Sequence, residues 1–132
     1  MLRPDISKAI DATPANIRAE ITGPAAASLE LLNAYLSPDE TVETMASASI
    51  EKGEEITSLL VVTDRRLIFI APAPQAVGWR LSKLTKSQAY SGYFFVEGDA
   101  GEYSCGLVDD EWSTTFEGKV KQAASQAVLA GT

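Results

Sequence analysis

The sequence predicts an α+β fold: a bent antiparallel β-sandwich or barrel of about seven strands, capped by a C-terminal α-helix and preceded by an N-terminal helical extension. Apolar residues recur at helical spacing over the first third, follow strand patterns from Thr41, and return to a 3.6-residue period from Asp109. The 132 residues, 45% of them apolar, suffice for one core. We therefore expect one structural unit, with the extension over residues 1–36 and a domain over residues 37–132.

The first third predicts three short helices. The first covers residues 4–12, and Thr13 with Pro14 forms a cap and first-turn pair for a second helix that ends at Gly23. The third follows Pro24 and carries a stripe at three- and four-residue spacing, made of Ser28, Leu31, Leu32, Tyr35 and Leu36. This stripe must be covered, either by the chain's own sheet or by another subunit.

The middle of the chain predicts strands joined by polar turns. Residues 37–40 (SPDE) read as a capping box and a single helical turn, after which the pattern changes. The most apolar segment is a hairpin around Asp64 and Arg65, which we expect at the core. Residues 98–101 (GDAG) suit a turn in the last hairpin. The expected strands are residues 41–49, 56–63, 66–71, 77–81, 84–90, 93–97 and 102–107.

A long helix is expected from Asp109 onward. One face of this helix is apolar, and three acidic residues stand at its positive N-terminal end, where the helix dipole favours them. The apolar face consists of Trp112, Phe116, Val120, Ala123 and Ala127. This helix closes the predicted domain.

Two motifs, together with this element order, carry a resemblance to a known family. Residues 59–69 (LLVVTDRRLIF) form an apolar strand, a Thr, a charged turn and Arg-Leu-Ile-Phe, and residues 36–40 (LSPDE) precede the first strand. Trp112 lies in the first turn of the closing helix. In these features the chain resembles the bacterial pleckstrin-homology (PH-like) family over residues 36–128. The resemblance implies a PH-like fold, no shared active site and, in some members, homo-oligomeric assembly.

Composition argues against several classes of function. A formal charge of −7 opposes binding to nucleic acid and limits any membrane contact to a peripheral one. No apolar run approaches the length of a membrane span, and no secretory signal is recognisable. The lone Cys105 fits a buried strand position and a cytoplasmic protein. The absence of histidine removes the commonest general base and metal ligand, so we expect no enzyme, no cofactor and no metal.

A basic stretch is the best candidate anion site. Between Arg65 and Val96 the chain has no acidic residue, although the rest is acidic. The candidate patch consists of Arg65, Arg66, Arg80, Lys83 and Lys86. Two readings are open: binding of a peripheral lipid or small anion, or ion pairing with acidic neighbours in the fold or in a partner.

Aromatic residues crowd the segment around Ser91 and Gly92, where Tyr90, Tyr93, Phe94 and Phe95 serve either the core or an interface. The candidate interface consists of Leu31, Leu32, Tyr35, Tyr93 and Phe94. The leading hypothesis is a noncatalytic PH-like protein-interaction module that assembles with copies of itself or with another protein. The alternative is the lipid- or anion-binding domain.

Overall fold

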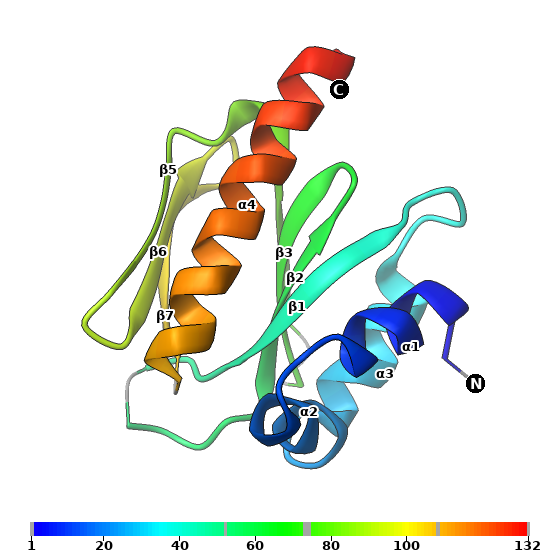
Figure 1. Ribbon diagram of the computed structural model, residues 1–132, viewed down its shortest axis with the longest axis vertical. Coiled ribbons are helices and arrows are strands. Elements are labelled where there is room, and N and C mark those ends of the chain that lie inside the picture. The colour runs from blue at the N-terminus through cyan, green and yellow to red at the C-terminus, as the bar shows by residue number, and fades with distance from the viewer. Residues whose placement is uncertain (1, 52, 73–74, 108, 132) are drawn as a thin grey trace.

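The computed structural model describes residues 2–51, 53–72, 75–107 and 109–131, which form three N-terminal helices, seven antiparallel strands in two sheets and a C-terminal helix. The N-terminal helices pack against one side of the four-stranded sheet, and the three-stranded sheet lies on its other side (Figure 1). This arrangement confirms the predicted α+β class and is consistent with a PH-like fold. The two sheets do not close into a barrel.

The N-terminal helices are α1 (Pro4–Asp11), α2 (Ala15–Thr22) and α3 (Ala26–Tyr35). Pro4 occupies the first turn of α1, where its missing N–H costs nothing. Gly23 ends α2, and a Cβ at this position would lie 2.8 Å from the carbonyl oxygen of Ala19. The buried faces of these helices include Ile6, Ile10, Ile17, Ile21 and Leu32.

The larger sheet, sheet A, has the strand order β1 (Val42–Ala48), β2 (Ser58–Thr63), β3 (Arg66–Ala71) and β4 (Gln75–Arg80). One of its two inner strands, β2, is buried at all six residues. The tilted contacts of the Tyr103 ring with Phe69 (4.9 Å between ring centroids) and Trp79 (6.0 Å) place these two side chains on the face toward the second sheet. The opposite face contacts α1, α2 and α3.

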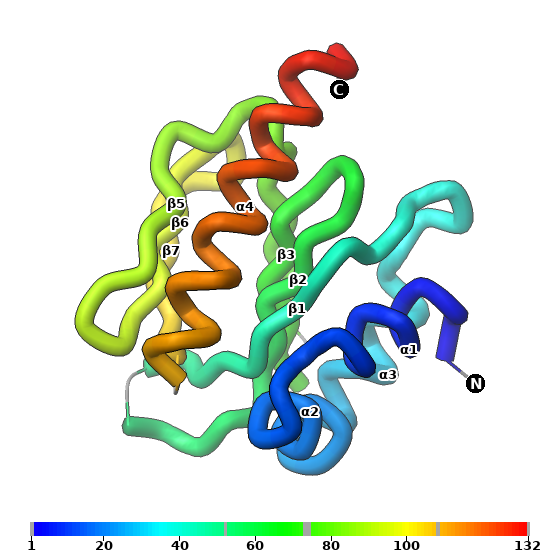
Figure 2. Tube along the Cα trace, in the orientation of Figure 1, coloured from blue at the N-terminus to red at the C-terminus, as the bar shows by residue number. Residues whose placement is uncertain are grey.

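The apolar stripe of the third helix is covered mainly by the chain's own sheet. Leu32 of α3 is fully buried, and Ser28 and Leu29 are buried beside it, against the chain's own sheet. The larger part of the stripe is covered within the chain. Figure 2 shows the same layering along the Cα trace, with the helices and the three-stranded sheet on opposite sides of sheet A.

The smaller sheet, sheet B, contains β5 (Lys86–Tyr90), β6 (Tyr93–Gly98) and β7 (Gly101–Gly106), and the 3₁₀ turn η1 (Leu81–Lys83) leads into it from β4. β5 begins at Lys86, two residues later than expected, because the 3₁₀ turn extends to Lys83 and residues 84 and 85 connect it to the strand. In the other direction β4 begins two residues earlier than expected, because Gln75 pairs with Ala71. In the described chain, an isolated bridge between Ser49 and Gly106 joins the two sheets.

The C-terminal helix α4 (Asp110–Ala130) lies across the two sheets. Its N-cap is Asp109, whose carboxylate accepts a hydrogen bond from the Trp112 N–H at 2.8 Å. The Trp112 indole donates to the Met45 carbonyl oxygen at 3.2 Å, and the Phe116 ring meets Phe94 edge-on at 5.5 Å. Within the described part of the chain, no helix has the length and apolarity that crossing a membrane requires.

Candidate functional site

The basic residues were the first candidate site, and three of the five have carboxylate partners. Arg65 pairs with Asp39 at 2.8 Å, and Arg80 pairs with Asp99 at 2.8 Å. Arg66 pairs with Glu40 at 2.6 Å. For these three residues the structure agrees with the second reading, ion pairing within the fold, because acidic side chains distant in sequence lie beside the guanidinium groups.

The Arg66–Glu40 pair is the most buried of these contacts. Glu40 is 1% exposed, and its carboxylate accepts two hydrogen bonds from Arg66 and one from the Thr63 hydroxyl at 2.7 Å. The Arg66 guanidinium also stacks over the Tyr35 ring, 4.7 Å from its centroid. Burial raises the pKa of Glu40, but hydrogen bonds from Arg66 and Thr63 outweigh it and hold the pKa below its usual value.

This pair joins the two sequence motifs. Glu40 belongs to the segment at residues 36–40, and Thr63 and Arg66 belong to the hairpin at residues 59–69. The Ser37 N–H donates to Glu40 at 3.3 Å, so half of the predicted capping box is formed. The same carboxylate thus holds the turn before β1 against the β2–β3 hairpin. Its role is structural, since both of its oxygens are occupied by the fold.

The remaining two basic residues are exposed. Lys83 lies in the 3₁₀ turn, and the Lys86 ammonium lies 5.6 Å from the centroid of the Phe95 ring. Lys86 also pairs across the β5–β6 ladder with Glu97. Of the predicted patch, Lys83 and Lys86 are therefore the two exposed residues for which no ion pair is described.

The candidate interface residues divide between core and surface. Leu32 and Phe94 are fully buried, and their assignment to an interface is wrong, because Leu32 lies on the buried face of α3 against sheet A and Phe94 packs on Phe116. Leu31 is half-buried against the core. Tyr35 is 37% exposed beneath Arg66, and Tyr93 is half-buried at the surface of sheet B.

The outer face of sheet B carries an aromatic cluster. Tyr90 pairs with Tyr93 across the β5–β6 ladder, and the Tyr93 and Phe95 rings lie 5.9 Å apart. Tyr90 is 67% exposed. We call Tyr90, Tyr93 and Phe95 the aromatic ledge. Phe94 faces inward because successive side chains of a strand point to opposite faces, so the ledge consists of the residues that alternate with the core.

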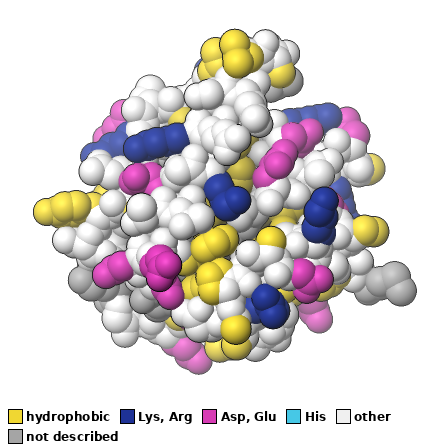
Figure 3. Space-filling model, viewed as in Figure 1, with side chains coloured by type: hydrophobic (Ala, Val, Ile, Leu, Met, Phe, Trp, Pro, Cys, Tyr) yellow, Lys and Arg dark blue, Asp and Glu magenta, His cyan; other side chains and the backbone are white. Residues whose placement is uncertain are grey.

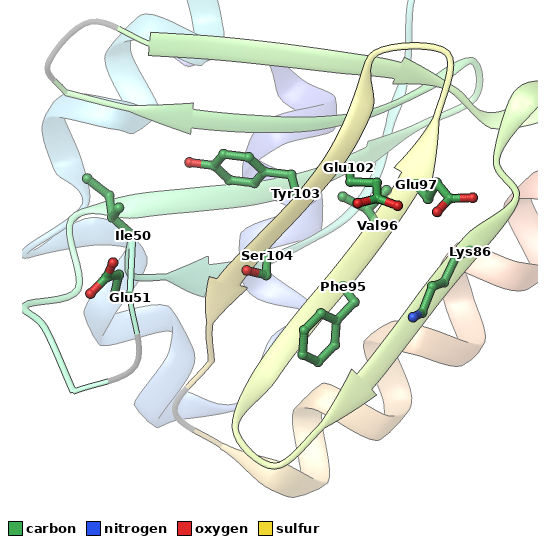
Figure 4. Close-up of a pocket in the computed structure, with 9 residues that line it drawn as sticks. All are labelled: Ile50, Glu51, Lys86, Phe95, Val96, Glu97, Glu102, Tyr103 and Ser104. Atoms are coloured by element: carbon green, nitrogen blue, oxygen red, sulfur yellow. The ribbon is translucent and has the colours of Figure 1, made fainter.

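A shallow hollow of about 540 Å³ lies beside the ledge, centred on β7 (Figure 4). In this view, the side chains on the viewer's side of sheet B are Phe95, Lys86, Glu97 and Ser104. The Tyr103 ring extends from β7 toward sheet A, where it contacts Phe69 and Trp79. Ile50 and Glu51 border the hollow across from β7, and Ile50 is 44% exposed. The described lining carries three carboxylates and one ammonium: Glu51, Glu97, Glu102 and Lys86.

Acidic side chains predominate among the described residues that line the hollow. A hydrogen bond from the Thr85 hydroxyl to Glu97 at 2.7 Å, with further contributions from Glu102 and Lys86, lowers the pKa of Glu97. The hollow is therefore an open, negatively charged surface. The β6–β7 ladder brings Glu97 and Glu102 opposite each other.

The reactive side chains in the described part of the chain include the lone cysteine and the potential metal ligands. Cys105 is buried on the inner side of β7, and burial raises the pKa of its thiol to about 12. A thiol with this pKa is not a nucleophile near neutral pH. No group of three or more Cys, Asp or Glu side chains among the described residues is arranged to hold a metal ion.

No protein-family model matches the sequence, and no curated protein shows significant similarity to it.

Proposed function

We propose that the chain is a noncatalytic, PH-like protein-interaction module that associates with copies of itself through the aromatic ledge. The observation that carries the proposal is the exposure of Tyr90 beside Tyr93 and Phe95 on the outer face of sheet B. Sheet A is packed on both faces by other parts of the chain, whereas the ledge lies on the outer face of sheet B. Tyrosine and phenylalanine are enriched at interfaces because they bury a large area with few rotatable bonds.

Charge favours the ledge as the place where two copies meet. The protein carries a net charge of −7, so most of its surface repels a second copy. The three side chains of the ledge are uncharged at neutral pH, and their cationic neighbour Lys86 partly offsets the acidic surroundings. Contact through the ledge therefore avoids the like-charge repulsion that other faces would incur.

The proposal includes three further expectations. The chain is a member of the bacterial PH-like family, supported by the Glu40–Arg66 contact between its two motif segments. It works in the cytoplasm, where a lone buried thiol such as Cys105 stays reduced. It does not bind nucleic acid, given its charge. The alternative of lipid or anion binding loses its main support, because Arg65, Arg66 and Arg80 are paired with carboxylates.

The test is the solution mass of the whole chain by light scattering after gel filtration, compared with the 14.1 kDa monomer. We expect a defined multiple of this mass for the wild type and a monomer for Tyr90→Ser. Val128→Ser is the matched control, since Val128 is an apolar residue 61% exposed on α4. A monomeric wild type at a concentration of about 100 μM, where even a weak micromolar dimer would form, would refute self-association.

Figure 3 shows why this control is suitable. Hydrophobic side chains gather at the C-terminal end of α4, where Val128 and Leu129 are 61% and 87% exposed. This end of the helix projects beyond the sheets and lies apart from sheet B (Figure 1). If assembly depends on the ledge, Tyr90→Ser will be a monomer and Val128→Ser will keep the mass of the wild type. If any loss of exposed apolar surface disrupts assembly, both variants will be monomers.

A further inference from the structure

The outer edge of β7 offers unpaired backbone groups to a partner. Gly106 exchanges both of its backbone hydrogen bonds with Ser49, at 2.9 Å each, so its N–H and C=O point away from β6. Because backbone direction alternates along a strand, Glu102 and Ser104 present their N–H and C=O groups to the same edge. The described chain pairs with this edge only at the Ser49–Gly106 bridge.

The other three sheet edges have side-chain carboxylates bonded to their backbone. Asp5 accepts from the Val42 N–H at the β1 edge at 2.8 Å, and Asp99 accepts from the Arg80 N–H at the β4 edge at 3.1 Å. Glu117 of α4 accepts from the Ala89 N–H at the β5 edge at 2.6 Å. Proteins block exposed edges in this way, or with proline, lysine or bulges, to prevent unwanted pairing.

Among the described residues, none provides such protection at the β7 edge. Its segment from Gly101 to Gly106 contains no proline or lysine, and its register with β6 is continuous. The hollow of about 540 Å³ lies along this edge and leaves room beside it. An unprotected edge next to an open hollow is the geometry in which an extended peptide adds to a sheet.

The negative charge of the hollow favours a peptide with basic side chains. Glu51, Glu97 and Glu102 line it, and Lys86 alone opposes them among the described lining residues. Ile50 and Phe95 add apolar contact on either side of β7. We propose that β7 binds, as a fourth strand of sheet B, an extended segment of another protein that carries Lys or Arg side chains.

The length of this segment follows from the edge. The Ser49–Gly106 bridge occupies one end of β7, and the turn at Asp99 and Ala100 ends the other. Pairing with Glu102 and Ser104 requires about four residues of extended chain, or about 13 Å. Side chains on one face of the added strand lie beside Glu102 and Ser104, and long basic side chains there extend over β7 toward Glu97 on β6.

Self-pairing of this edge is disfavoured. Two copies joined along β7 would bring two sets of acidic side chains together in one hollow, which raises the energy of that dimer. The two surfaces therefore bind different partners: the ledge binds a second copy of the chain, and the β7 edge binds a basic segment of another protein. The ledge at the β5–β6 turn remains available when β7 is occupied, although Phe95 borders both surfaces.

In the experiment, random nine-residue peptides displayed on phage are selected for binding to the whole chain. The enriched peptides are then synthesised, and their affinity for the chain is measured. We expect enrichment of peptides with Lys or Arg at alternate positions. Ser104→Pro should weaken their binding by about tenfold, because it removes one outward N–H. Proline is tolerated at this position, since the N–H it removes is not bonded to β6.

Glu102→Lys provides an independent variant, since Glu102 is exposed and its replacement leaves the backbone unchanged. We expect it to weaken basic peptides severalfold and to reduce the salt dependence of binding. Glu30→Lys is the matched control for charge, because Glu30 is exposed on α3 on the other side of sheet A, and it should leave affinity unchanged.

Failure to enrich any peptide overturns the proposal, as does enrichment of peptides whose affinity is unaffected by both Ser104→Pro and Glu102→Lys. Repeating the measurement with Tyr90→Ser separates this proposal from the proposed function. Peptide binding retained by a monomeric Tyr90→Ser chain supports the edge independently of the ledge. Peptide binding lost in Tyr90→Ser alone assigns the peptide to the ledge and overturns the edge proposal.

Discussion

Removal of the charge on Glu40 tests the central polar contact of the fold. In Glu40→Gln, one carboxylate oxygen becomes an amide N–H₂ that faces the donors Arg66 and Thr63, and the Arg66 guanidinium loses its counter-charge. Breaking one side of a buried ion pair costs about 3 to 5 kcal/mol. The Arg66 side chain is 24% exposed and keeps some contact with water, so we expect the lower limit of that range.

The measurement is urea unfolding followed by Trp fluorescence, since Trp79 and Trp112 are both buried. A loss of about 3 kcal/mol should also lower the melting temperature by about 10 °C in a chain of this size. The control is Asp39→Asn, which removes the exposed partner of Arg65 and should change stability far less. Equal effects of the two variants would refute the assignment of the buried pair as the dominant polar contact.

The same carboxylate predicts a pH dependence. The folded-state pKa of Glu40 lies below its usual value of 4.5, so its contribution to stability is complete above pH 4.5 and is lost as pH falls through the folded-state pKa. The wild type should therefore lose stability more steeply than Glu40→Gln below pH 4.5. Parallel acid unfolding curves for the two proteins would contradict this expectation.

Four other changes probe individual contacts. Phe94→Ala should lower the free energy of unfolding by about 4 kcal/mol and Phe95→Ala far less, because the two neighbours lie on opposite faces of β6; equal losses would refute the face assignment. Asp109→Ala should cost about 1 kcal/mol through loss of the α4 cap, measured by thermal unfolding, whereas an unchanged melting temperature would contradict the cap. Ser58→Ala should stabilise the protein by about 1 kcal/mol, because its buried hydroxyl has no partner among the described residues; a destabilised variant would reveal one. Cys105 should resist a thiol reagent at pH 8 until urea unfolds the chain, and immediate labelling would show that the thiol is accessible.

Periodicity predicted the order of elements because each element buries one face. The apolar stripe around Leu32 predicted a helix, and the alternation of residues 93–97 predicted a strand. The structure has α3 and β6 at these positions. The same patterns do not say which apolar face meets which element. Leu32 and Phe94 were therefore assigned to an interface, although the chain's own sheet and α4 cover them.

Charge pairing was harder to predict, since it depends on residues distant in sequence. Arg66 and Glu40 are 26 residues apart, and Arg80 and Asp99 are 19 apart. An acid-free stretch around Arg66 therefore left anion binding and ion pairing both open, and in the structure sheet register and turns bring carboxylates to it. The motif segments did contain Glu40 and Arg66, but no spacing rule within either segment connects them.

The covering of sheet A on both faces has a consequence for how the protein opens. All six residues of β2 are buried, its neighbours β1 and β3 bond both of its edges, and α1 to α3 contact the sheet face away from sheet B. The amide protons of β2 can exchange with solvent only after the layers around them separate. The slowest-exchanging amides of β2 should therefore report global unfolding. The N-terminal helices then belong to the same cooperative unit as the sheet, so a chain shortened by residues 1–36 would leave Leu59 and Val61 in water.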